Sequence, residues 1–188
     1  MILFKFDNVL IQGRFMVIWL MGLAGSGKST LGRALYTELK SRGINNLVYL
    51  DGDEFREVIG AFGYDKASRI EVAKKRAKLC QILSNQGLIV IASSISMFKE
   101  NYEFNRVYLK EYFEVYVRCE MEELKRRNQK DLYSGKTKNV VGMDIEIDSP
   151  QAHLILDNEL GKLEENLQTL IGAIKLTNSN LLQYLKCF

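Results

Sequence analysis

Cysteine, histidine and proline are scarce in this sequence of 188 residues. The three cysteines, Cys80, Cys119 and Cys187, are widely spaced and odd in number, which argues against a disulfide framework or a cysteine-ligated metal. We therefore expect reduced thiols and a cytoplasmic location. The single histidine, His153, stands beside a predicted strand, where packing or surface exposure is expected in place of catalysis.

Strong charge of one sign and long apolar runs are also absent. The formal net charge is +3 and the basic residues are dispersed, so neither nucleic acid nor an anionic membrane is an expected partner. No apolar run approaches the length of a transmembrane helix. Lys5, Asp7 and Arg14 interrupt any signal-peptide core in residues 1–15. This N-terminal extension is either an extra strand or hairpin, or an upstream translation start with little structural role.

The remaining composition is that of one soluble globular domain. Apolar residues make up 47% and charged residues 26% of the chain, which is enough for a single core. No repeat, low-complexity segment or linker divides the sequence, so we assign residues 16–188 to one domain.

A glycine-rich stretch is the most informative part of the chain. It follows the apolar run 16–21 and precedes a segment with helical spacing, which is the context of a P-loop. Its glycines would turn the backbone tightly and point N–H groups at a phosphate, while Lys28 would reach the β- and γ-phosphates and Ser29 would bind Mg²⁺. We therefore predict a nucleoside triphosphate and Mg²⁺ as cofactors. The predicted residues are Gly22, Leu23, Ala24, Gly25, Ser26, Gly27, Lys28, Ser29 and Thr30.

Apolar runs and helical spacings alternate along the rest of the chain. Strands are predicted at 16–21, 47–50, 88–92, 113–117 and 153–156, and helices at 31–39, 66–86, 100–111, 121–128 and 162–174. This alternation predicts an α/β fold, a doubly wound parallel sheet with flanking helices. An apolar helical tail over 181–188 would pack on its own domain or on a second subunit, so a homodimer stays open.

Polar residues follow two of the predicted strands. Asp51 and Asp53 come after strand 47–50, and the run 93–96 follows strand 88–92. Ligands of parallel α/β sheets sit at this end of the strands, so these residues are expected near the glycine-rich stretch. The alternative for the aspartates is a structural turn, because Asp-Gly is a common turn signal.

Residues 129–150 break the alternation. They hold Lys130, Lys136, Lys138, two glycines and the only proline, Pro150, with little apolar periodicity. A solvated surface loop and a lid that covers phosphates both fit a mobile basic segment of this kind.

Four short sequence blocks narrow the range of functions that the P-loop allows. They are residues 50–56, 63–69, 93–98 and 127–133, which in this order resemble the adenylyl-sulfate kinases. Members of that family use MgATP to phosphorylate the ribose 3′-hydroxyl of adenosine 5′-phosphosulfate. The resemblance runs from residue 17 to residue 157 and implies a P-loop nucleoside triphosphate kinase fold with a lid.

The resemblance also implies residue roles. Asp53 would orient the accepting hydroxyl or take its proton, with Lys28 as the second catalytic group. Asp51 would support the water shell of a metal held by Ser29, Asp51 and Asp53, and Arg127 would lie near ATP. Arg56 and Arg69 would hold the anionic part of the acceptor with forked guanidinium groups. The implied acceptor site consists of Asp51, Arg56, Tyr64, Arg69, Val72, Ile95, Ser96, Lys130, Lys138 and Val140.

Several positions depart from the family pattern on the acceptor side. Val72 stands in place of an asparagine, and Lys74 and Lys75 in place of paired arginines, so a polar contact and forked charges are lost. Tyr64 can still stack on a base, but Val140 offers no second ring. Acceptor recognition is therefore expected to differ from that of the family, whereas the donor side is intact.

Three functions stay open at this point. The first is phosphorylation of adenylyl sulfate, as the resemblance implies. The second is phosphorylation of another small nucleotide, for which a cytidine diphosphoramidate kinase of bacterial capsule modification is the known precedent. The third is a nucleotide-binding regulator without activity, and the intact Lys28, Ser29, Asp51 and Asp53 argue against it.

Overall fold

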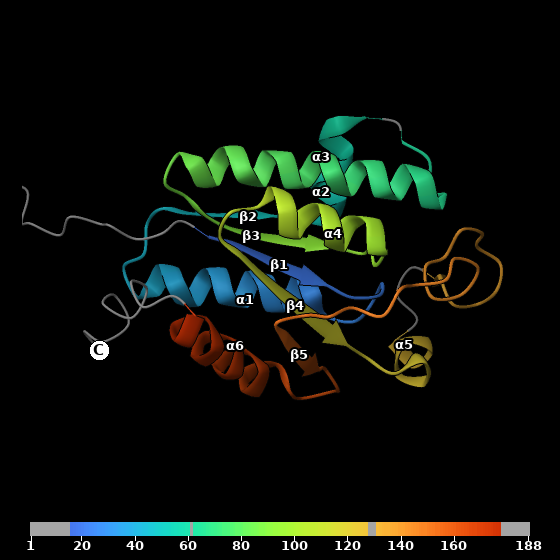
Figure 1. Cartoon of the computed structure of the whole chain (residues 1–188). Helices are drawn as coiled ribbons and strands as arrows, with labels where there is room; N and C mark the ends of the chain where they lie inside the picture. Colours follow the sequence, from blue (N-terminus) through green and yellow to red (C-terminus); the bar gives the residue numbers. More distant parts are fainter. Residues whose placement is uncertain (1–15, 61, 128–130, 178–188) are drawn as a thin grey trace, which may run out of the picture.

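A five-stranded parallel sheet forms the centre of the computed structural model, which describes residues 16–60, 62–127 and 131–177. The sheet has the order β2-β3-β1-β4-β5, and every neighbouring pair is parallel. Helices α1 and α6 cover one face and helices α3 and α4 the other (Figure 1). The predicted doubly wound α/β fold is therefore confirmed. The strands are β1 (Val17–Met21), β2 (Leu47–Leu50), β3 (Ile89–Ser94), β4 (Tyr112–Arg118) and β5 (Leu154–Asp157).

All but one of the helices in the described part of the chain lie where helices were predicted. The exception is α2, which begins directly after Asp51, where a structural turn was the alternative interpretation, and which has a single buried side chain, Phe55. Helix α4 is shorter than predicted, because the chain becomes extended at Leu109 and buries that side chain. The helices are α1 (Lys28–Ser41), α2 (Gly52–Ile59), α3 (Lys66–Asn85), α4 (Lys99–Tyr108), α5 (Met121–Arg127) and α6 (Leu163–Thr177).

The central strand β1 is buried on both faces, which explains its unbroken apolar run. Successive side chains of a strand point to opposite faces. Ile18 and Leu20 accordingly pack in the cluster with α1 and α6, whereas Trp19 and Met21 pack in the cluster with α3 and α4. The two layers hold β1 firmly, so the turn that follows it starts from a fixed point.

The carboxyl ends of the parallel strands lie at one edge of the sheet. The stretch 22–27 leaves β1 there, Asp51 follows β2, and Ile95 follows β3. Segments far apart in sequence are thus brought to the edge where ligands of such sheets bind.

Residues 131–150 pack more closely than the sequence predicted. Tyr133, Val140, Val141 and Ile145 are buried and join the cluster on the α3 and α4 face. Val141 and Ile145 also form a β-bridge. This part of the predicted lid is therefore attached to the domain by apolar side chains.

Membrane-spanning helices were also sought. In residues 16–60, 62–127 and 131–177, no helix combines the length and the apolar character needed to cross a bilayer.

Candidate active site

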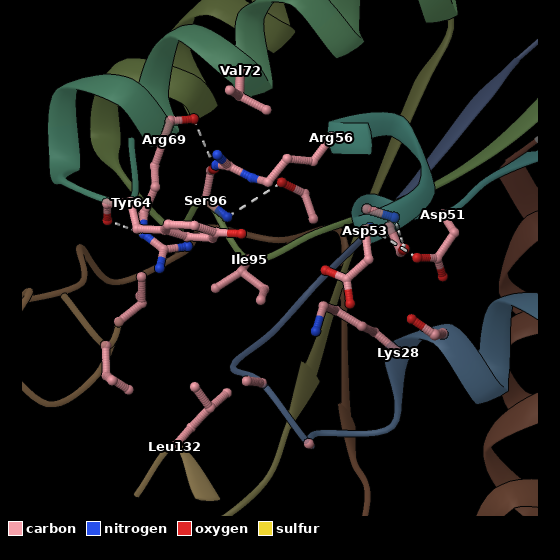
Figure 2. Close-up of a pocket in the computed structure, with 18 of the residues that line it drawn as sticks. Lys28, Asp51, Asp53, Arg56, Tyr64, Arg69, Val72, Ile95, Ser96 and Leu132 are labelled. Atoms are coloured by element: carbon pink, nitrogen blue, oxygen red, sulfur yellow. Dashed lines mark hydrogen bonds between the residues drawn. The ribbon is translucent and has the colours of Figure 1, made fainter. Parts of the chain in front are cut away.

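A pocket of about 500 Å³ opens at the carboxyl edge of the sheet. Its walls come from the P-loop, the start of α2, the first half of α3, the end of β3 and the segment 132–141 (Figure 2). It brings together most of the predicted site residues, from both the donor and the acceptor sides. They are Ala24, Gly25, Gly27, Lys28, Ser29, Thr30, Asp51, Asp53, Arg56, Tyr64, Arg69, Val72, Ile95, Ser96, Lys138 and Val140.

The remaining predicted residues are placed differently. Gly22, Leu23, Ser26 and Arg127 do not line the pocket, although Arg127 donates a hydrogen bond to the Gly25 oxygen of the P-loop. Lys130 falls in residues 128–130, outside the described residues.

Two glycines are required by the shape of the P-loop. Gly27 has a φ of 90°, and a Cβ there would collide with the amide of Asn158. A Cβ at Gly22 would lie 2.5 Å from the carbonyl oxygen of Val117. Left-handed backbone and close approach both favour glycine, so this turn depends on its sequence. The turn delivers Lys28 and Ser29 to the first turn of α1.

Three side chains from elsewhere in the chain hold successive P-loop carbonyls. The Tyr133 hydroxyl donates to the Ala24 oxygen at 2.6 Å, and Arg127 Nη1 donates to the Gly25 oxygen at 3.0 Å. Asn158 Nδ2 donates to the Ser26 oxygen at 2.7 Å. These three hydrogen bonds fix the backbone of the loop, in which successive N–H groups can form an anion-binding concavity. No motif marked Tyr133 or Asn158 for this role, although Asn158 stands at the carboxyl end of a predicted strand.

Replacing Tyr133 by phenylalanine should weaken ATP binding while leaving the fold intact. The change removes one buried hydrogen bond, worth about 1 kcal/mol, so the KM for ATP should rise by about fivefold. Burial raises the pKa of Tyr133 to about 12, so its hydroxyl remains a donor at neutral pH. Steady-state kinetics with varied ATP measure the effect. Tyr108→Phe, on the surface of α4, is the matched control, and an equal change in both variants would contradict the assignment.

Asp51 is buried and caps α2. Its Oδ1 accepts the Asp53 N–H at 2.9 Å and its Oδ2 accepts the Tyr49 hydroxyl at 2.9 Å. Burial alone would raise the pKa of this carboxyl, but these hydrogen bonds and the charge of Arg33 outweigh burial and lower it. Asp51 is therefore an anion with a structural task at the helix start as well as a place in the pocket.

Asp53 lies in the first turn of α2 and its side chain is exposed. The Lys28 side chain extends toward the Asp53 carboxylate across the pocket (Figure 2). The predicted acid and the predicted phosphate-binding lysine are thus neighbours, although they lie in different elements. A hydroxyl placed between Asp53 and a phosphate held by the P-loop would be within reach of both.

The oxygen donors at this end of the pocket fit a magnesium ion. Mg²⁺ usually keeps several waters and takes one or two carboxylates together with substrate phosphates. Ser29, Asp51 and Asp53 offer one hydroxyl and two carboxylates of this kind. Within the described ranges, no group of three or more His, Cys, Asp or Glu residues could hold a metal without such phosphates.

Two arginines gather around Tyr64 on the opposite wall. Their Cζ atoms lie 4.6 Å (Arg56) and 5.4 Å (Arg69) from the centroid of the Tyr64 ring (Figure 2). Arg56 also donates to the Phe62 and Gly63 oxygens, and Arg69 to the Tyr64 oxygen. Burial and the charge of Arg56 lower the pKa of Arg69. In the part of the chain that is described neither arginine has a carboxylate in salt-bridge range, so the pair offers its charge to an anionic ligand.

Both guanidinium groups lie against the ring of Tyr64, which is still 57% exposed, and two apolar side chains also belong to this wall. Val72 and Val140 are both buried. Ser96 donates from its hydroxyl to the Arg69 carbonyl, and its N–H is bound by Ser94. The polar groups predicted to recognise the acceptor thus serve partly to fix one another.

One charged residue of this wall was missed by the sequence reasoning. Arg76 on α3 is buried and lines the pocket, but it stands one position beyond the block in which Lys74 and Lys75 replace arginines. Leu132, Thr137 and Asn139 also line the pocket without having been predicted.

A phosphate-binding turn facing an exposed carboxylate, with an anion-binding wall beyond it, is the arrangement of a P-loop phosphotransferase. The sequence profile of the adenylylsulphate kinase family matches residues 14–157, and the chain belongs to that family. The resemblance found in the motif blocks is thereby confirmed.

Named relatives agree with this class. The cytidine diphosphoramidate kinase of Campylobacter jejuni subsp. jejuni is 49% identical over 165 residues, an alignment that covers 85% of this chain and 96% of the relative. The adenylyl-sulfate kinase of Oceanobacillus iheyensis is 32% identical over 167 residues, covering 85% and 83%. The solved APS kinase of Mycobacterium tuberculosis, in complex with AMPPNP and APS, superposes with a TM-score of 0.79 at 26% identity, covering 87% and 99%. The chain is thus an ATP-dependent nucleotide kinase.

Proposed function

We propose that this kinase transfers the γ-phosphoryl group of ATP to the ribose 3′-hydroxyl of cytidine diphosphoramidate. The observation that carries the proposal is the 49% identity to a cytidine diphosphoramidate kinase along nearly its whole length. The position of the departures from the adenylyl-sulfate kinase pattern supports it, since they fall at Val72 and Val140 in the acceptor wall and spare the P-loop.

The residues of the pocket suit this transfer. P-loop N–H groups and Lys28 would hold the β- and γ-phosphates, and Asp53 would align the ribose hydroxyl and take its proton as the oxygen attacks phosphorus. The new bond joins the ribose oxygen to the γ-phosphorus, and the bond to the β,γ-bridging oxygen breaks. Ser29, Asp51 and Asp53 would hold Mg²⁺, which when bound neutralises charge on the transferring phosphate. Lys138 would add positive charge from the lid segment.

The acceptor wall favours recognition by charge over recognition by stacking. Arg56 and Arg69 line the pocket, and their positive charges, with the N–H donors that their backbone contacts leave over, would suit a diphosphoramidate. The ring of Tyr64 is engaged by both guanidinium groups, and Val140 supplies no ring opposite it. A nucleotide held mainly by its anionic end does not require the paired rings that sandwich an adenine.

Adenylyl sulfate is the second candidate acceptor. The family match over residues 14–157 and the adenylyl-sulfate kinase relative at 32% identity favour it. Its anionic end would use the same two arginines.

An acceptor panel tests the proposal. The purified chain with MgATP would be assayed for ADP release with cytidine diphosphoramidate, adenylyl sulfate, CDP and ADP as acceptors. We expect the highest kcat/KM with cytidine diphosphoramidate, and product analysis should place the new phosphate on the 3′-oxygen. Higher kcat/KM with adenylyl sulfate would overturn the proposed acceptor. If the chain binds ATP but turns over no acceptor, the hypothesis of a nucleotide-binding regulator without activity is favoured.

A further inference from the structure

Arg76 is a buried cation whose partners are carbonyl oxygens and an aromatic ring. Its residue is 4% exposed, on the pocket side of α3. Burial lowers its pKa to about 10, so it remains charged at neutral pH. No carboxylate lies within salt-bridge distance of it in residues 16–60, 62–127 and 131–177. Buried charges are normally paired. Because Arg76 forms no ion pair with the described residues, its burial calls for another explanation.

The guanidinium of Arg76 forks between two elements. Nη1 donates to the Ser93 oxygen at the end of β3, at 2.8 Å. Nη2 donates to the Gly52 oxygen in the first turn of α2, at 3.0 Å. Its Cζ also lies 4.9 Å from the ring centroid of Phe55, which is the buried side chain of α2. The planar fork of an arginine suits two acceptors at once, which the point charge of a lysine does not.

The Asp51 cap, which is bonded to Tyr49 of β2, also holds the first turn of α2, but few other contacts fasten this helix to the sheet. The Gly52 N–H donates to the Ser93 hydroxyl at 3.1 Å, and Phe55 is the one buried side chain among the eight residues of the helix. Asp53 follows Gly52 directly, so the position of its carboxylate depends on how the first turn is held. The charge of Arg76 also interacts favourably with Asp51 and Asp53.

We propose that Arg76 is a positioning residue, which holds the first turn of α2 against the end of β3 and thereby places Asp53 opposite the P-loop. The proposal rests on the role of Asp53 given above. A displacement of about 1 Å at a reacting group can lower a rate by about 100-fold, so a loosened turn should slow transfer without weakening ATP binding.

Kinetics of two variants test this role. Arg76→Met should lower kcat by about tenfold to 100-fold and leave the KM for ATP within about twofold. Arg76→Lys keeps the charge and can reach one of the two carbonyls, so its kcat should lie between that of Arg76→Met and that of the unmodified chain. Lys78→Met, exposed two residues further along α3, is the matched control. Assays use whichever acceptor the panel favours, so an error in the proposed acceptor leaves this test intact.

Hydrogen–deuterium exchange gives a readout independent of any acceptor. Arg76→Met should speed exchange at the amides of α2 and leave those of α1 unchanged. A kcat for Arg76→Met within about twofold of the unmodified chain would overturn the proposal. So would a loss of ATP binding together with faster amide exchange throughout the described helices and strands. If Arg76→Met does not fold, the same criteria apply to Arg76→Lys. If Asp53→Asn is fully active while Arg76→Met speeds exchange only at α2, the catalytic role of Asp53 is contradicted. The role of Arg76 in holding the first turn of α2 is then still supported.

Discussion

Replacing Lys28 by alanine is expected to abolish useful phosphoryl transfer to every acceptor. Lys28 is buried at the start of α1, and its Nζ donates to the Leu23 oxygen at 3.1 Å within the P-loop itself. A phosphate in the loop would be a further, charged acceptor for that ammonium. Loss of one preorganised donor at a developing charge lowers kcat by about 100-fold to 1,000-fold.

Single-turnover kinetics with the preferred acceptor, and calorimetry with ATP, measure this loss. Lys40→Ala removes an exposed lysine from the last turn of the same helix and serves as the control. Because α1 is retained in both variants, a difference between them reports on the phosphate site. A Lys28→Ala enzyme that keeps most of its rate would contradict the P-loop role.

The fold could be predicted from the sequence because its elements are long or strongly patterned. The unbroken apolar run of β1 is typical of a buried strand, and the spacing of apolar residues in α3 is typical of a helix. Helix α2 was missed, since it is short and buries one side chain, and Asp-Gly also signals a turn. The signal was present: Asp51 is a good N-cap, and Asp53 and Glu54 place acidic groups in the first turn.

The site was predictable where a contiguous motif carried it. Most residues of the stretch 22–30 meet Asp51 to Asp53 in the pocket, as expected. Contacts between distant segments were not predictable, because no local pattern shows which side chain reaches which carbonyl. Asn158 meets Ser26 across 132 positions of sequence, and Tyr133 meets Ala24 across 109.

The surroundings of Tyr64 could not be predicted from the sequence. The expectation that Tyr64 stacks on a base stays a prediction, and the structure adds that Arg56 and Arg69 lie against its ring, which is still 57% exposed. The acceptor wall thus combines two cationic side chains beside Tyr64 with buried apolar side chains at Val72 and Val140. Because the departures from the family pattern spare the P-loop, we expect the acceptor wall to decide which nucleotide is phosphorylated.

Replacing Asp53 by asparagine should separate catalysis from nucleotide binding. Asparagine keeps the size of the side chain but cannot take a proton, so kcat should fall by about 100-fold to 10,000-fold. The cap of α2 should survive, because the Asp53 backbone N–H, and not its carboxylate, bonds to Asp51. ATP affinity should therefore stay within about twofold, which isothermal calorimetry can measure beside the steady-state rate.

Glu57→Gln is the matched control for this change. Glu57 is exposed on α2 one turn after Asp53 and does not line the pocket, so the variant makes the same chemical substitution on the same helix. We expect it to retain the full rate. A near-normal kcat for Asp53→Asn would rule out this carboxylate as the group that activates the acceptor hydroxyl, whereas equal losses in both variants would point to the net charge of α2 as the cause.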